Sequence, residues 1–257
     1  MATERRERDP STGTSGSDGE YEAHLERSRT VWDRWSDWYG MSERDFEPIR
    51  EAAIDRLDLE PGDRVLEIGC GPGVNFERVR REIGPDGELV AVDYSPEMVA
   101  NARERIETHG WENVRVRRAD ATTIAFDEPF DAALATLSLS VMPDVRRAVE
   151  NVSRSIVPGA RLAVVDVRPA LSGPARVLNP LVRRFFRWYA NWNLDGDVAG
   201  SLEAVFDERG APAGDRDGGR ADRSRSRDGV AAGGCEIVDT HFAGIAFTAI
   251  CTKRDAD

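Results

Sequence analysis

The chain has 257 residues, 40% of them hydrophobic, so it can bury one sizeable core, and a single domain is the better expectation. Its 47 acidic and 35 basic side chains give a net charge of −12, which would repel nucleic acid and excludes it as the expected partner. The first residues lack the apolar segment of a signal peptide, and no stretch is long and apolar enough to span a bilayer, so we expect a cytoplasmic protein.

The basic residues are unusual because Lys253 is the only lysine and all the others are arginines. An acidic, lysine-poor composition rich in Asp, Glu, Ala, Gly and Arg resembles that of halophilic proteins. In such proteins, dense carboxylates keep the surface hydrated while concentrated salt screens their repulsion. The composition therefore predicts that folding depends on salt.

Residues 1–20 are polar or charged with almost nothing to bury, and we expect a disordered tail ahead of a domain formed by residues 21–257. Residues 21–40 carry aromatic side chains at spacings of three and four, namely Trp32, Trp35, Trp38 and Tyr39. This spacing places an aromatic stripe on one face of a helix. The stripe either packs on a sheet or covers a bound ligand.

An apolar strand that begins at Val65 runs through Glu67 into a turn with glycine at every second position, Gly69, Gly71 and Gly73. Such a turn lets bare backbone approach a ligand and directs helix N–H groups towards it. The third glycine is out of register with the dinucleotide-binding fingerprint. The carboxylate of Glu67 would also lie beside phosphate, so a ligand with a cationic end fits better.

The segment resembles motif I of the class I S-adenosylmethionine (SAM) methyltransferases, whose ligand carries a sulfonium and an ammonium group. The resemblance covers about residues 29–252 and implies that SAM is the cofactor. It also implies an α/β, Rossmann-like fold with a seven-stranded, mostly parallel sheet, an antiparallel last strand and helices on both faces. In the turn it assigns Glu67, Gly69, Cys70, Gly71 and Gly73 to the cofactor.

A second strand, residues 89–92, ends at Asp93, where a carboxylate can accept both ribose hydroxyls. A helix should then begin with Ser95 as its N-cap and Pro96 at its first position. The resemblance places Met98 against the adenine ring and assigns Tyr94 to the same site.

Three further strands are expected at residues 114–116, 130–135 and 160–166, the last of them after a turn at Pro158-Gly159. The resemblance implies that Asp120, after the third strand, accepts the adenine amino group. It also assigns Ala121 and Thr136, which follow the third and fourth strands, to the cofactor. The loops after these strands should converge on one edge of the sheet.

The run from Trp32 to Tyr39 resembles the Tyr-Asp-rich segment that closes over SAM and substrate in the ubiquinone/menaquinone C-methyltransferase (methyltransferase type 11) family. In this chain Tyr39-Gly40 replaces the usual Tyr-Asp ending.

Residues 173–193 form an expected amphipathic, lid-like insert, with Arg183, Arg184 and Arg187 between aromatic and aliphatic side chains at helical intervals. This helix could cover an apolar substrate cavity, contact an anionic membrane surface through residues 176–192, or serve in packing or dimer formation. We favour a small lipophilic acceptor, either quinone-like or lipid-like.

Residues 207–234 have low complexity and cannot build a core, so they are either a tolerated surface insert or the product of a reading-frame error. Residues 202–206 look like the last helix before them. Two strands of a final hairpin are expected after them, at residues 236–242 and 245–251.

The cysteines at positions 70, 235 and 251 are widely spaced and fit neither a disulfide framework nor a metal site. Methyl transfer needs no obligatory acid or base, so no catalytic residue is assigned, although His24 or His241 could serve if a phenol is deprotonated. A non-catalytic SAM-binding protein and a nicotinamide-dependent oxidoreductase are the alternative functions. The sequence does not determine the oligomeric state.

Overall fold

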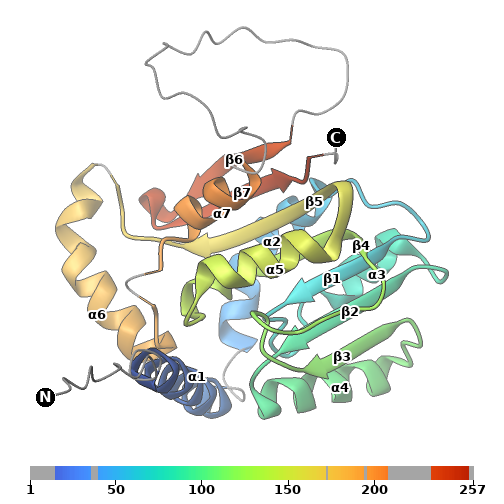
Figure 1. Ribbon diagram of the computed structural model, residues 1–257, viewed down its shortest axis with the longest axis horizontal. Helices are drawn as coiled ribbons and strands as arrows, with labels where there is room; N and C mark the ends of the chain where they lie inside the picture. The colour runs from blue at the N-terminus through green and yellow to red at the C-terminus, as the bar shows by residue number, and fades with distance from the viewer. Residues whose placement is uncertain (1–14, 36–39, 172, 194–195, 208–232, 255–257) are drawn as a thin grey trace, which may run out of the picture.

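Short apolar strands that alternate with helices build one sheet in the computed structural model, which describes residues 15–35, 40–171, 173–193, 196–207 and 233–254 (Figure 1). The strands are β1 (Arg64–Ile68), β2 (Glu88–Asp93), β3 (Val114–Arg118), β4 (Phe130–Thr136), β5 (Ile156–Val167), β6 (Gly234–His241) and β7 (Ala246–Thr252). They form a seven-stranded sheet in the order β3-β2-β1-β4-β5-β7-β6. The first five strands pair in parallel, and β7 is antiparallel to both β5 and β6. This topology confirms the predicted fold class.

Helices cover both faces of the sheet because strands that are buried on two sides need apolar cover on each. The α-helices are α1 (Ser15–Trp35), α2 (Gly40–Asp55), α3 (Phe76–Ile83), α4 (Pro96–His109), α5 (Val145–Ser155), α6 (Asn179–Ala190) and α7 (Val198–Phe206). Residues of α5 and α7 share one core cluster with the sheet, and residues of α2, α3 and α4 share a second cluster. Among the residues that the structure describes, the 3-10 helices are η2 (Leu139–Val141), η3 (Pro174–Leu178) and η5 (Phe242–Gly244).

The parallel register brings the carboxyl ends of neighbouring strands to one edge of the sheet. Ile68 at the end of β1 pairs with Val92 of β2 and with Ala135 of β4. The turns that follow these strands therefore face each other across this edge, where open α/β sheets bind their ligands. Helix α1 lies beside α6 at one end of the molecule (Figure 1).

Several element boundaries differ from the prediction, and helix α7, for example, begins at Val198 and not at residue 202. Residues 15–20, which we expected in a disordered tail, begin α1, whereas residues 1–14 lie outside the described part. Strand β5 begins at Ile156, so Pro158 and Gly159 interrupt the strand, with a register shift against β4, and do not precede it. Pairing continues across the interruption because Gly159 donates its N–H to the carbonyl of Lys253, over 2.8 Å.

Two predicted features lie outside the described residues. The aromatic stripe is described only as far as Trp35, so Trp38 and Tyr39 are not covered. The low-complexity insert is likewise not covered between residues 208 and 232.

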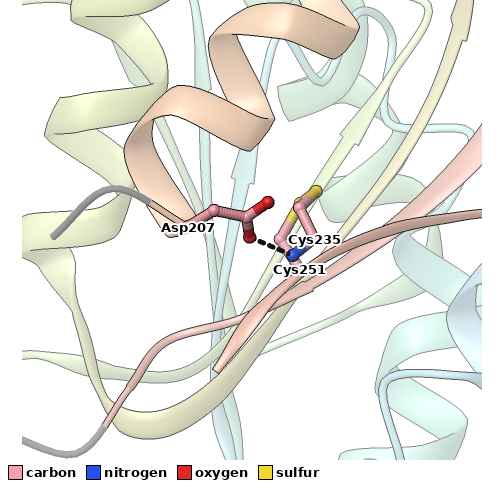
Figure 2. Close-up of a disulfide and its surroundings, with 3 residues drawn as sticks. All are labelled: Asp207, Cys235 and Cys251. Atoms are coloured by element: carbon pink, nitrogen blue, oxygen red, sulfur yellow. Dashed lines mark hydrogen bonds between the residues drawn. A yellow bond between two sulfur atoms is a disulfide. The ribbon is translucent and has the colours of Figure 1, made fainter. Parts of the chain in front are cut away.

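The structure corrects the expectation for the cysteines, because Cys235 and Cys251 form a disulfide between β6 and β7 (Figure 2). The two residues are direct partners in the register of the hairpin. Asp207, at the end of α7, accepts a hydrogen bond from the Cys235 amide at 2.9 Å. The pairing follows from strand register, which cysteine spacing along the sequence does not reveal.

Cys70 has a free thiol and is buried. Burial raises the pKa of this thiol well above its usual value, so the thiol is poorly suited to act as a nucleophile. None of the helices in the described ranges is long and apolar enough to cross a membrane.

Candidate active site

Two glycines of the turn after β1, Gly69 and Gly73, lie too close to neighbouring side chains to carry a Cβ atom. Gly69 has a φ of 62°, and a Cβ atom there would lie 2.3 Å from the Cβ of Ser138. Ser138 belongs to the loop after β4, and its hydroxyl donates to the Ile68 carbonyl at 3.0 Å. A Cβ atom on Gly73 would likewise meet the Phe76 ring at 2.3 Å. The glycines therefore let the turn sit directly between the β4 loop and α3.

Asp93 ties this turn to the start of α4. One carboxylate oxygen accepts the amide of Gly71 and the other accepts the amide of Ser95, both at 2.9 Å. Burial raises the pKa of Asp93, while these amide hydrogen bonds oppose the shift. Each oxygen keeps a second lone pair, so the carboxylate can still accept hydrogen bonds from a ligand.

The predicted cap of α4 is confirmed, since the Ser95 hydroxyl accepts from the Met98 amide at 3.1 Å and Pro96 begins the helix. The same hydroxyl donates to Asp33 of α1 at 2.7 Å. Ser95 therefore links the cap of one helix to the side of another.

Asp120 lies after β3 and contacts α1. One of its carboxylate oxygens accepts the Thr122 amide at 2.8 Å, and the other accepts the hydroxyl of Tyr21 at 2.5 Å. Burial, together with the bond to Asp120, raises the pKa of Tyr21 above its ordinary value. The Tyr21 hydroxyl therefore stays protonated and remains a donor.

Helix α1 is held over the ends of β2, β3 and β4 by polar contacts. Besides the bonds from Tyr21 and Asp33, His24 donates from Nε2 to the Val141 carbonyl at 2.9 Å. Asn191, which follows α6, donates to the Ser28 hydroxyl at 2.7 Å. The sequence did not predict these contacts, because it singled out only the aromatic stripe of this helix and His24 as a conceivable base. The spacing of Tyr21, Leu25, Ser28 and Trp32 at intervals of three and four could have indicated them.

A cavity lies between α1, the glycine turn and the loops after β2, β3 and β4. The predicted site residues that line it are Gly69, Gly71, Asp93, Tyr94, Met98, Asp120 and Ala121. Helix α1 adds Leu25, Ser28, Arg29 and Trp32. The structure thus brings four separately predicted loops to one cavity.

The loop after β4 supplies an apolar wall to this cavity, through Leu137, Val141, Met142 and Pro143. Asn193 fixes this loop by donating from its side chain to the carbonyls of Met142, at 2.8 Å, and Pro143, at 3.0 Å.

Asp166, a buried residue near the end of β5, also fixes this loop. Its carboxylate accepts the amides of Ser140, at 3.0 Å, and Val167, at 2.7 Å. Burial raises the pKa of Asp166 to about 6.

The other predicted residues, Glu67, Cys70, Gly73 and Thr136, do not line the cavity. Glu67 is fully buried behind the turn, and its Oε1 accepts the Asn75 side-chain amide at 2.7 Å. Asn75 also donates to the Thr136 hydroxyl at 3.0 Å and accepts from Arg50 Nε at 3.1 Å. Sequence reasoning did not identify Asn75 or Arg50.

Glu67 has an unusual protonation behaviour. Its Oε2 is buried and has no hydrogen-bond partner among the described residues. Burial raises the pKa of this carboxyl to about 7, against the lowering effects of Asn75 and Arg50. A positive charge nearby would stabilise the ionised form.

Neither histidine considered as a base lines the cavity. His24 bonds to the Val141 carbonyl, and burial lowers its pKa. His241 lies on β6, where its Nε2 is 3.1 Å from the Thr248 hydroxyl.

Comparisons with known proteins agree with this geometry. Residues 65–159 match the family model described as "Methyltransferase domain". A phosphatidylethanolamine N-methyltransferase of Cereibacter sphaeroides is 31% identical over a match that covers 60% of this chain and 76% of that protein. The chain belongs to the class I SAM-dependent methyltransferases. A 2-phytyl-1,4-naphtoquinone methyltransferase of Nostoc sp. is 28% identical over a match that covers 65% of this chain and 70% of the Nostoc protein.

A solved structure, the YcgJ protein of Bacillus subtilis, matches the methyltransferase with a TM-score of 0.57 at 18% identity. The match covers 79% of this chain and 97% of that one, and it shows a shared fold. The predicted resemblance to the methyltransferase type 11 group and the prediction of SAM as cofactor are both confirmed.

The cavity of the methyltransferase has the chemistry that SAM requires. The lone pairs of Asp93 can accept ribose hydroxyls, and the buried Met98 offers an apolar surface to a flat ring. Gly69 and Gly71 present bare backbone to the same cavity. Bound there, the cofactor would supply the sulfonium methyl group, and the protein would supply hydrogen-bond acceptors and apolar cover.

Proposed function

We propose that this methyltransferase transfers the methyl group of SAM to a small lipophilic acceptor, either quinone-like or lipid-like. The observation that carries the proposal is that apolar side chains of α1 and of the loop after β4 line the same cavity as Asp93 and Asp120. Leu25, Val141 and Met142 offer contact to an apolar molecule and few hydrogen bonds to a polar one. Two relatives support the same class of acceptor, since one is named for methylation of the lipid phosphatidylethanolamine and the other for methylation of a naphthoquinone.

Within this proposal Asp93 holds the ribose and Asp120 receives the adenine amino group beside the Tyr21 hydroxyl. Gly69 and Gly71 contact the cofactor through their backbone. Cys70, between these two glycines, and Gly73, which follows them, maintain the conformation of the turn. Tyr94, Met98 and Ala121 enclose the adenine.

Glu67 and Thr136 act from behind the turn through Asn75, which bonds to both. The carboxyl of Glu67 gains a negative charge most readily when the cationic end of the cofactor is present, because opposite charges stabilise each other.

The contribution of the protein to the reaction is then alignment and exclusion of water. Helix α1 covers the cavity through hydrogen bonds at three strand ends, so a bound acceptor is held against the methyl donor. Displacement at the methyl carbon needs no proton transfer to reach its transition state, and no catalytic base is assigned.

Calorimetric titration with SAM and S-adenosylhomocysteine tests the cofactor site. Asp93→Ala should weaken binding at least about 100-fold, because each lost hydrogen bond to a charged acceptor contributes roughly 1.5–3 kcal/mol. Asp86→Asn, on an exposed turn, is the matched control and should bind normally. Equal affinity in wild type and Asp93→Ala would refute the assignment of this cavity to SAM.

The acceptor is tested by measuring S-adenosylhomocysteine formation with a demethylated quinol, with phosphatidylethanolamine in detergent, and with water-soluble amines and phenols. Turnover with either lipophilic acceptor is the expected result. Turnover with the water-soluble compounds alone would overturn the proposed substrate class while leaving the SAM site intact.

A further inference from the structure

The outer surface of η3 and α6 is apolar, which is unusual for this acidic protein. In the described residues, the large hydrophobic side chains that are at least half exposed lie mostly on or beside these elements; Phe242 lies elsewhere. The set is Leu171, Val177, Leu178, Leu181, Phe185 and Trp188. Two of them, Val177 and Trp188, have exposed fractions of 81% and 69%. A cluster of this kind on an exposed helix marks an interaction surface.

The same segment has a charge opposite to that of the whole chain. Residues 167–194 contain five arginines and no acidic residue, whereas the chain carries a net charge of −12. Arg176, Arg183, Arg184 and Arg187 are all exposed. This segment is therefore a cationic area on an anionic protein.

The apolar and basic side chains of α6 occupy different positions around the helix. Val182 and Phe186 pack inward against Val167 and Trp192. Leu181, Phe185 and Trp188 follow each other at spacings of three and four on the outward face. The exposed arginines at 183, 184 and 187 lie to one side of this row, and Arg184, three residues from Leu181 and four from Trp188, is directly adjacent to it. An apolar row bordered by basic residues is the pattern of a helix that lies in a membrane interface.

We propose that the surface formed by residues 174–190, the α6 surface, docks on an anionic lipid bilayer. The apolar row enters the boundary between head groups and acyl chains, and the arginines contact lipid phosphates. Charge complementarity favours this occupant over a second copy of the chain, because a two-fold contact would bring the arginines of one α6 surface against those of the other. The inference goes beyond the proposed acceptor, since docking requires neither SAM nor a substrate.

Co-sedimentation with vesicles tests the proposal. The intact protein is mixed with vesicles of phosphatidylcholine alone or with roughly 30% phosphatidylglycerol, which supplies anionic charge. The lowest KCl concentration at which circular dichroism shows a folded protein is used, because molar salt shortens the screening length to about 3 Å. We expect binding to the anionic vesicles, weakening as salt is raised. Equal binding to both vesicle types, or to neither, would overturn the proposal.

Matched variants locate the surface. Arg183→Gln with Arg187→Gln should weaken binding to anionic vesicles roughly 25-fold at low salt, since each arginine near such a surface contributes about fivefold. The control, Arg81→Gln with Arg103→Gln, removes two exposed arginines from α3 and α4 and should bind as the wild type does. If both pairs have equal effects, the attraction does not involve α6.

The apolar row is tested by Leu181→Ser combined with Trp188→Ser, which should lower vesicle binding while titration with S-adenosylhomocysteine stays unchanged. Light scattering after gel filtration is the companion measurement. A dimer that dissociates in this variant would assign the α6 surface to a second copy and overturn membrane docking. A wild-type protein that binds S-adenosylhomocysteine but no vesicles would refute the inference alone and leave the methyltransferase assignment standing.

Discussion

The hydroxyl of Tyr21 donates to the carboxylate of Asp120 at 2.5 Å, joining the first described helix to a loop 99 residues further along the chain. The hydroxyl also lies 2.6 Å from that of Thr122. Because Asp120 lines the cavity, the bond fastens the cover of the site to one of its walls.

Tyr21→Phe should therefore loosen α1. We expect the free energy of unfolding to fall by about 1 kcal/mol, the usual contribution of one partly exposed hydrogen bond. The dissociation rate of S-adenosylhomocysteine should rise about fivefold, which corresponds to the same energy. Denaturant unfolding and stopped-flow fluorescence measure the two effects. Glu22→Gln, on the exposed side of α1, is the control, and a variant indistinguishable from it would show that the bond does not hold the helix.

Glu67 should make stability fall as pH rises. Its pKa is about 7 in the folded protein against 4.5 for the unperturbed group, so the folded state holds a proton that the unfolded state releases. The free energy of unfolding therefore falls by about 3 kcal/mol in total between pH 4.5 and 7, for a shift of this size. Above pH 7 this contribution no longer changes.

Glu67→Gln removes this titration while keeping an acceptor for Asn75. The free energy of unfolding, measured by urea titration across the same pH range, should decline less steeply in the variant than in the wild type. Glu77→Gln changes an exposed carboxylate on α3 and should keep the wild-type slope. Parallel curves for wild type and Glu67→Gln would contradict the raised pKa.

The disulfide between Cys235 and Cys251 closes a loop with a sequence separation of 16 residues. Loop-closure entropy for this length predicts that reduction, or Cys235→Ser, lowers the free energy of unfolding by about 3 kcal/mol. Alkylation of the denatured protein followed by mass spectrometry should label Cys70 alone before reduction and all three cysteines after it. Three labels without reduction would show that the bond does not form.

Salt should stabilise the fold, because concentrated ions screen the repulsion among the excess carboxylates. We expect a higher thermal midpoint by circular dichroism in about 2 M KCl than in about 0.2 M KCl, where screening is weaker. The same midpoint at both concentrations would refute the halophilic interpretation.

The strands and the turns after them could be predicted from the sequence because they depend on local patterns. The buried run before Gly69 and the cap at Ser95 are signals carried by adjacent residues. The converging loops then follow from the parallel sheet, which explains why Asp93 and Asp120 line one cavity.

Other parts of the site depend on contacts between distant segments. Strand alternation places Glu67 on the same sheet face as Val65, which packs with α2 and α3, so its side chain meets Asn75 and Arg50 and does not line the cavity. Tyr21 finds Asp120 only when α1 docks, and the disulfide depends on hairpin register. A short window of sequence can indicate which face of α1 makes contacts, but it does not identify the distant partner of any of these residues.

The two asparagines just beyond α6 join the proposed membrane surface to the cofactor chamber. Asn191 donates to Ser28 on the helix that covers the cavity, and Asn193 donates to the carbonyl of Met142 in the loop after β4. A shift of α6 must carry these groups along or break their bonds. Lipid and cofactor would then be linked ligands, and reciprocity requires each to change the affinity for the other by the same factor.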